Sequence, residues 1–110
     1  MKLDVAFLPR LVRGPEAIAC VVVDALRASS SIIVLLARGV EEIAVAATPA
    51  EARRVARRGR GRYLLCGEIE GLAPRGFDCG NSPSEFDALD LRGRGVVLST
   101  TNGTRALHRL

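Results

Sequence analysis

Short apolar runs alternate with helical patterns along this chain of 110 residues, and this alternation constrains the fold more than any other feature. The apolar runs cover residues 17–23, 42–47, 63–66 and 95–100. Continuous apolar runs of this length are typical of strands that are covered on both faces. The alternation favours βαβ crossovers, so we predict one α/β domain over residues 1–110, with a mostly parallel sheet of about four strands and helices on both faces.

Capping residues mark the expected helices. Residues 29–38 form an apolar helical pattern that is followed by a glycine, the residue most common just past a helix C-terminus. Residues 48–51 (Thr-Pro-Ala-Glu) combine an N-cap, a proline at the first helical position and a capping-box glutamate, and predict a helix that ends near residue 58. Residues 82–85 (Ser-Pro-Ser-Glu) repeat this pattern and predict a short helix, and a last helix is expected from about Thr104.

The expected fold looks incomplete. The helix over residues 29–38 is apolar nearly all round, so both of its sides require cover. The last helix stops after about two turns, at the end of the sequence. We expect further residues of a longer chain, or another chain, to cover these surfaces, and exposed apolar surface favours association as a homodimer.

The charge and cysteine content restrict the partners and the compartment. Sixteen Lys and Arg residues against twelve Asp and Glu residues give a net charge of +4, which suits anionic small molecules as readily as nucleic acid. The arginine-rich stretch 53–62 is typical of a solvated helix face, and the absence of interleaved aromatic residues argues against a nucleic-acid site. The odd cysteine count without zinc-site spacing favours a reduced, cytoplasmic setting. The longest uncharged apolar run is too short to span a bilayer.

Polar residues collect after the predicted strands. Ligands of an open parallel sheet bind outside the carboxyl ends of the strands. The residues that follow the runs there are Asp24, Arg27, Ser29, Ser30, Glu68, Thr101, Asn102, Gly103, Thr104 and Arg105. Arginines and helix N-termini bind phosphate or sulfonate oxygens, and carboxylates suit Mg²⁺. The sequence therefore predicts a site for an anionic ligand and a hard cation at this edge.

The glycine-rich segment 67–81 is long for a connection in a small domain, and such loops are usually functional or disordered. We expect an ordered loop anchored by Phe77 and Leu72, with Asp78 and Asn81 as its polar candidates.

Each candidate also has a purely structural alternative. Asp24 can cap the following helix, and Arg27 can pair with Asp24. The serines can be N-caps, Glu68 a surface residue, and Asn102-Gly103 an ordinary turn.

Several phosphate chemistries are excluded by missing motifs. The chain has no P-loop motif, and no G-x-G-x-x-G follows the first predicted strand. Cys20 and Cys66 lie within predicted strands, and no arginine follows Cys79 at the spacing of a cysteine phosphatase. His108, the only histidine, lies in the last predicted helix, which argues against a Ser-His-Asp triad.

Four segments together resemble the 2-phosphosulfolactate phosphatase family. They are residues 24–31 (DALRASSS), 67–68 (GE), 76–83 (GFDCGNSP) and 99–105 (STTNGTR). The resemblance covers the chain from about residue 17 onward and implies a Mg²⁺-dependent hydrolase that converts 2-phosphosulfolactate to sulfolactate and phosphate. In methanogenic archaea this step serves coenzyme M synthesis. Family chains are about twice as long, so the sequence corresponds to an N-terminal half, and Cys79 stands where an apolar residue is expected.

The resemblance and the predicted edge lead to one mechanistic hypothesis. Asp24, Glu68 and Asp78 would hold Mg²⁺, and the nucleophile would be a metal-bound water or Asp24 itself. Arg27, Arg105 and the 102–104 backbone would neutralise developing charge. The full expected set is catalytic Asp24, Arg27, Glu68 and Asn102, and substrate-binding Ser29, Ser30, Asn81, Ser82, Thr101, Gly103, Thr104 and Arg105.

Two rival functions come from other classes. The chain can bind phosphorylated or sulfonated metabolites without turnover, or act only in assembly with another chain. A nucleic-acid binder that uses residues 53–62 would show binding with a steep salt dependence.

Overall fold

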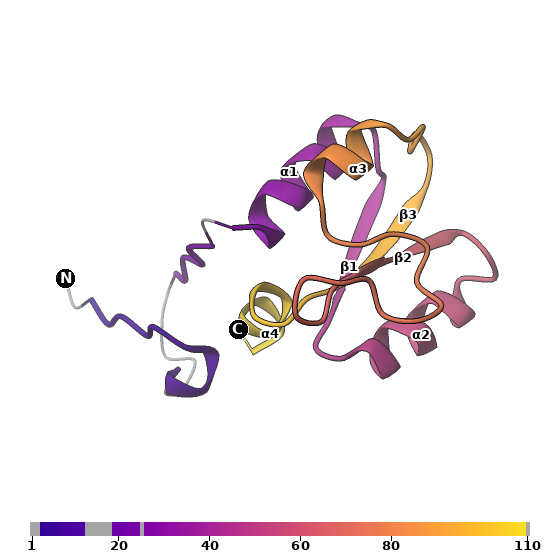
Figure 1. Ribbon diagram of the computed structural model, residues 1–110. Coiled ribbons are helices and arrows are strands. Elements are labelled where there is room, and N and C mark those ends of the chain that lie inside the picture. The colour runs from indigo at the N-terminus through magenta and orange to yellow at the C-terminus, as the bar shows by residue number, and fades with distance from the viewer. Residues whose placement is uncertain (1–2, 13–18, 25, 110) are drawn as a thin grey trace.

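The computed structural model describes residues 3–12, 19–24 and 26–109 (Figure 1). The expectation for the side chain of His108 lies outside what the structure describes. In chain order, the elements are the 3-10 helix η1 (Pro9–Leu11), α1 (Ala28–Ala37), β1 (Glu42–Ala46), α2 (Pro49–Arg58), β2 (Tyr63–Gly67), α3 (Pro83–Asp87), β3 (Gly95–Ser99) and α4 (Gly103–Arg109). From α1 onward, this order is the one that the sequence predicts.

The sheet is parallel throughout its three strands and has the order β1-β3-β2. The last residues of the outer strands, Ala46 and Gly67, both pair with Ser99 of the central strand. Because the three strands end at the same level, the segments that follow them leave the sheet at one edge. The predicted α/β class with βαβ crossovers is confirmed.

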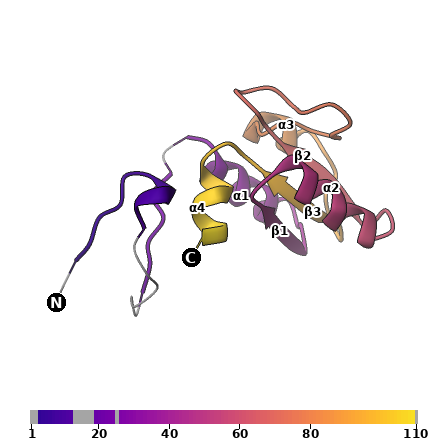
Figure 2. The same ribbon diagram turned by 90° about the horizontal axis from the view of Figure 1, so that it is seen from below.

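Helices cover both faces of the sheet, as predicted (Figure 2). On the central strand, Val96 and Leu98 pack in one core cluster with Leu35 of α1 and Phe86 of α3. Val97 belongs to the cluster on the opposite face, where α2 packs. The alternation of side chains along β3 thus supplies both halves of the core.

The predicted strand over residues 17–23 is wrong where it can be checked. Residues 17 and 18 lie outside the described residues, and residues 19–23 carry no strand. Val21 and Val23 are 86% and 87% exposed, and the segment stands away from the sheet (Figure 1). A β-branched run forms a strand only where it pairs with a neighbouring strand and is covered by another layer of the fold. Within the described residues, the sheet therefore has three strands and not about four.

Helix α1 keeps an uncovered apolar side. Leu35 is buried, but Ile33 is 67% exposed and Leu36 is 55% exposed. The expectation that this helix requires cover on both sides agrees with these exposures, since only one side is packed against the described residues.

The two similar capping patterns behave differently. At α2, the Thr48 hydroxyl accepts the Glu51 N–H at 3.2 Å, as the sequence predicts. At α3, the expected helix forms, but Ser82 makes no capping bond with its side chain. Its Glu85 carboxylate accepts the Gly80 N–H instead, at 3.2 Å.

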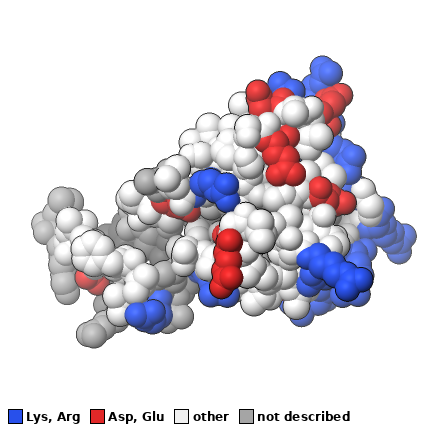
Figure 3. Space-filling model, in the orientation of Figure 1, with Lys and Arg blue, Asp and Glu red and all other residues white. Residues whose placement is uncertain are grey.

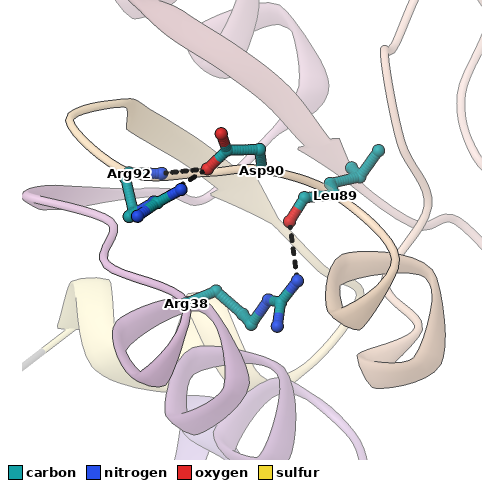
Figure 4. A network of polar contacts seen from close by, with 4 residues as sticks. All are labelled: Arg38, Leu89, Asp90 and Arg92. Carbon is teal, nitrogen blue, oxygen red and sulfur yellow. Dashed lines mark hydrogen bonds and ion pairs between the residues drawn. The ribbon is translucent and has the colours of Figure 1, made fainter.

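A small polar network ties the connection between α3 and β3 to the end of α1 (Figure 4). The Arg38 guanidinium donates to the Leu89 carbonyl oxygen at 3.2 Å. Both the backbone N–H and Nε of Arg92 donate to Oδ1 of Asp90, at 3.4 and 3.3 Å. Gly39, just past α1, has φ of +85°, the left-handed conformation expected after a helix.

Candidate functional site

Glu68 lies at the centre of the polar edge, the end of the sheet at which β1, β2 and β3 finish. It follows β2 directly, and its backbone N–H donates to the Ser99 carbonyl oxygen at 2.9 Å. Its Oε1 accepts the Thr101 N–H at 2.7 Å. Its Oε2 accepts the Thr101 hydroxyl at 3.1 Å and the Gly71 N–H at 2.8 Å. This carboxylate links the turn after β2 to the turn after β3 by hydrogen bonds. The alternative that Glu68 is only a surface residue therefore does not fit the structure.

Two opposing effects act on the pKa of Glu68. Partial burial pushes it upward, because the charged form loses water. The hydrogen bonds from Thr101 and Gly71 and the positive charge of Arg27 push it downward. The downward effects are larger, so the pKa of Glu68 lies below its ordinary value. The group is therefore a carboxylate anion at neutral pH.

The turn from β3 into α4 is buried and internally bonded. The Thr100 hydroxyl accepts the Thr104 N–H at 3.1 Å, and the Thr104 hydroxyl accepts the Thr100 N–H at 2.8 Å. The Thr104 hydroxyl also donates to the Thr100 carbonyl oxygen at 3.0 Å. Thr104 is fully buried, so its side chain organises the turn. Thr100 is not among the residues predicted from the sequence, although a threonine just before a helix is a known capping signal.

Asp24 meets this turn at Gly103, the first residue of α4. A Cβ atom on Gly103 would collide with Oδ2 of Asp24 and with Cβ of Ala28. Only glycine allows this close approach. A carboxylate beside a helix N-terminus is favoured by the unpaired N–H groups there. Asp24 does not cap α1, because the N-cap position of that helix is Arg27, which makes no capping bond with its side chain.

The start of α1 approaches the end of the long loop. Arg27 is half-buried and close enough to Glu68 for its charge to lower the pKa of that residue. One turn into α1, the buried Ser31 hydroxyl donates to the Asn81 carbonyl oxygen at 3.5 Å. The Asn81 side chain is only 4% exposed, and its Oδ1 has no hydrogen-bond partner among the described residues. Ser29 and Ser30 are half-buried in the first turn of the same helix.

The loop over residues 67–81 is ordered, as expected, but one of its predicted anchors is wrong. Phe77 packs against the core cluster under α2, whereas Leu72 is 76% exposed. Leu72 lies in a tight turn in which it and Ile69 bond to each other through their backbones, so its side chain points away from any core.

Three predicted site residues make hydrogen bonds that do not involve Glu68. The Asp78 Oδ2 atom accepts the Leu65 N–H at 2.8 Å on the outer side of β2. Arg105 is exposed, and its Nε donates to the Ala47 carbonyl oxygen at 3.4 Å, past the end of β1. Ser82 shares a hydroxyl hydrogen bond with Ser84. Within the described residues, no group of three or more His, Cys, Asp or Glu side chains is gathered as a metal would require.

The arginine-rich stretch lies on another part of the molecule. Basic side chains gather over α2, and acidic ones over α3 (Figure 3). Arg53 donates to the Arg75 carbonyl oxygen at 2.8 Å and stacks over the Phe77 ring at 5.3 Å. A shallow cavity of about 420 Å³ between α2 and β2 is lined by Arg53, Ala56, Arg57, Gly61, Tyr63, Leu65 and Asp78. None of these residues contacts Glu68, although Asp78 was predicted to belong to the same site.

Glu68, with the Arg27 charge near it, and Asp24, which lies against Gly103, flank the turn that follows β3 at the carboxyl ends of the parallel strands. Ligands of open α/β sheets bind at these strand ends. The family model described as 2-phosphosulpholactate phosphatase matches residues 8–110. The chain therefore belongs to the 2-phosphosulpholactate phosphatase family, as the resemblance in its motifs indicated.

Curated relatives agree with this assignment. The chain is 44% identical over 105 residues to a protein of Pseudothermotoga lettingae named "Probable 2-phosphosulfolactate phosphatase", with 96% of this chain and 44% of the relative covered. It is 41% identical over 109 residues to a protein of the same name from Carboxydothermus hydrogenoformans, with 99% and 44% covered. The chain thus spans less than half the length of these relatives. No helix in the described part of the chain is long and apolar enough to cross a membrane.

Proposed function

We propose that this chain contributes the polar sheet edge of a Mg²⁺-dependent phosphatase that hydrolyses 2-phosphosulfolactate to sulfolactate and phosphate. Family membership supports the proposal, and one observation carries it. The ionised Glu68 carboxylate is held by Thr101 and Gly71 within reach of the Arg27 charge. Asp24 lies against Gly103 at the same edge.

The donor chemistry of this edge fits Mg²⁺. This ion takes oxygen ligands and is usually held by one or two carboxylates together with substrate oxygens and water. We assign Asp24 and Glu68 as those carboxylates, because Glu68 remains ionised and binds Thr101, while Asp24 lies against Gly103, two residues further along the same turn. Asp78 would join them only after releasing the Leu65 N–H. When bound, Mg²⁺ would supply positive charge that neutralises and orients the phosphate group.

The remaining residues of the edge bind and orient the substrate. The Arg27 guanidinium, with its fork of N–H donors, suits the phosphate oxygens, and Arg105 suits the sulfonate or the carboxylate of the substrate. The N–H groups of Asn102 and Gly103 lie at the start of α4, where backbone N–H groups lack partners within the helix, whereas the Thr104 N–H already donates to the Thr100 hydroxyl. Ser29, Ser30, Asn81 and Ser82 are the polar groups that would surround the organic part of the substrate. The phosphoryl acceptor is a water molecule or the Asp24 carboxylate itself.

The test is phosphate release from 2-phosphosulfolactate by folded chain, with Mg²⁺ and with EDTA. We expect Mg²⁺-dependent turnover that falls at least about a hundredfold in Asp24→Asn and in Glu68→Gln, the size of loss typical when a charge-stabilising group is removed. Glu70→Gln is the matched control, because Glu70 is exposed and only two positions away. Full Mg²⁺-dependent turnover in Asp24→Asn would overturn the assignment of that residue.

The alternative within the same family is binding without turnover. The chain covers 44% of the relatives in length, so other parts of the family chain can complete the site. Binding of the substrate by a folded chain that releases no phosphate would favour this alternative over the enzymatic one. Loss of that binding in Glu68→Gln, but not in Glu70→Gln, would still place the ligand at the polar edge.

The partners and setting follow from the same features. The exposed Ile33 and Leu36 of α1 support association, which we propose to be a homodimer. The free cysteines support a reduced, cytoplasmic setting. Sedimentation of the folded chain at several concentrations tests the dimer, and a concentration-independent monomer would contradict it.

A further inference from the structure

Two buried cysteines face each other at the base of the long loop. Cys66 lies in β2, and Cys79 lies near the end of the loop that returns beside this strand. The two residues form a parallel β-bridge. Cys66 is 0% exposed and Cys79 is 7% exposed, and both belong to the same core cluster. Their side chains therefore point to the same face of the sheet.

Backbone hydrogen bonds fix this pairing on both sides. The Cys79 N–H donates to the Leu65 carbonyl oxygen at 3.3 Å, and the Gly67 N–H donates to the Cys79 carbonyl oxygen at 3.2 Å. Adjacent strands lie about 4.8 Å apart. Disulfides join Cα atoms about 4.4–6.8 Å apart. A bridge between Cys66 and Cys79 would therefore need side-chain rotation and little backbone movement.

The two cysteines lie close in sequence to two residues of the proposed site. Glu68 lies two positions after Cys66, and Asn81 lies two positions after Cys79. The loop between the cysteines also supplies the Gly71 N–H that binds the Glu68 carboxylate. A disulfide between Cys66 and Cys79 would hold both ends of the loop between them at the edge of the sheet.

We propose that Cys66 and Cys79 are an oxidisable dithiol pair, which a hydroperoxide converts reversibly into a disulfide that closes the loop. This modification does not depend on the proposed phosphatase activity. In the first step, the Cys79 thiolate attacks the peroxide O–O bond, and the products are a Cys79 sulfenic acid and water. In the second step, the Cys66 thiolate attacks the Cys79 sulfur and displaces the oxygen as a second water. The two thiols lose two electrons and two protons, and hydrogen peroxide gains them.

Burial sets the speed of this reaction. Cys66 is fully buried and Cys79 nearly so, and hydrogen peroxide therefore reaches either sulfur atom only slowly. Oxidation of the folded protein is slower than that of an exposed thiol. Cys79 is the first to react, because it retains slight exposure.

Tryptic peptides allow a direct test. Cleavage after Arg62, Arg75 and Arg92 places Cys66 in peptide 63–75 and Cys79 in peptide 76–92. The protein carries Cys20→Ser, which removes an exposed thiol and leaves the pair untouched. Folded protein is treated with hydrogen peroxide, alkylated, digested and examined by mass spectrometry without reduction.

We expect an intact monomer lighter by two hydrogen atoms and a linked peptide pair that dithiothreitol separates. The oxidised protein should also melt at a higher temperature, because the crosslink restricts the unfolded chain. The matched variant Cys20→Ser/Cys79→Ala should form no linked peptide and show no rise in melting temperature. A linked pair that forms only in urea, or sulfinic acid at either cysteine without any link, would overturn the proposal.

Discussion

Two valine-rich segments of this chain have similar sequences and opposite environments. In β3, Val96 and Val97 are 0% exposed and lie between β1 and β2. In the segment over residues 19–23, Val21 and Val23 are 86% and 87% exposed, and no strand forms. Their intrinsic preference for β-structure is the same, so the difference arises from what surrounds them. A strand forms where the fold provides paired neighbours and covering helices.

The same lesson applies to two other pairs of similar residues. Glu68 and Glu70 are close in the sequence, but only Glu68 is held by the turn that follows β3. Thr48 and Ser82 both precede a proline and a capping glutamate, but only Thr48 makes the capping bond with its side chain. Each pair permits a matched experiment in which the local sequence is similar and the tertiary position differs.

The largest difference is expected between Val97→Ala and Val21→Ala. Loss of two methyl groups from the buried Val97 should lower the free energy of unfolding by about 2 kcal/mol, because transfer and cavity effects add. The same change at Val21 should alter it by less than about 0.5 kcal/mol. Urea unfolding followed by circular dichroism measures both values. Equal losses would show that Val21 is buried in solution and would break the comparison.

The second prediction separates Glu68 from Glu70 by pH. The pKa of Glu68 is lowered in the folded state. Its contribution to stability is therefore present above the unfolded-state value of about 4.3 and is lost as the pH falls through the folded-state pKa. Glu68→Gln should lower the free energy of unfolding at pH 7, by less than Val97→Ala because the carboxylate is only partly buried, and this deficit should vanish in acid. Chemical unfolding of Glu68→Gln and Glu70→Gln at pH 7 and pH 3 provides the measurement. A deficit in Glu68→Gln that does not change with pH would contradict the prediction.

The third prediction compares the two caps. Thr48→Ala should lower the free energy of unfolding by about 1 kcal/mol, because the Glu51 N–H loses its partner at 3.2 Å. Ser82→Ala should cost less, since the Ser82 hydroxyl bonds only to Ser84. Thermal unfolding of the two variants measures the difference, and a larger loss at Ser82 would show that its hydroxyl caps α3 in solution.

The smallest effect is expected at the exposed connection before β3. Arg92 pairs with Asp90 at 3.3 Å, and both side chains are mostly exposed. Arg92→Ala should leave the melting temperature unchanged at physiological salt, because exposed ion pairs add little to stability. Calorimetry at low and high salt tests this expectation. A marked loss at both salt concentrations would mean that the Arg92 stem, which lies against Gly39, is part of the packing.

Much of the fold could be predicted because its signals are local. The Thr48 cap and the glycine after α1 placed helix ends, and the buried apolar runs placed β1, β2 and β3. The edge residues were also predictable, because the carboxyl ends of parallel strands lie together. The predictions for Leu72 and for residues 19–23 were wrong, since an apolar side chain indicates burial only if another element covers it.

Caps and periodicity act over a few neighbouring residues, so the sequence alone was enough to predict the order of the elements, the parallel class of the sheet and the residues that follow each strand. Which of those residues contact one another depends on the tertiary structure. Glu68 and Thr101 are 33 positions apart, and their bond exists because β2 and β3 end in register. The Asp78 carboxylate lies instead on the outer side of β2, where it accepts the Leu65 N–H. Local chemistry selects the candidates, but strand register and buried hydrogen bonds position them.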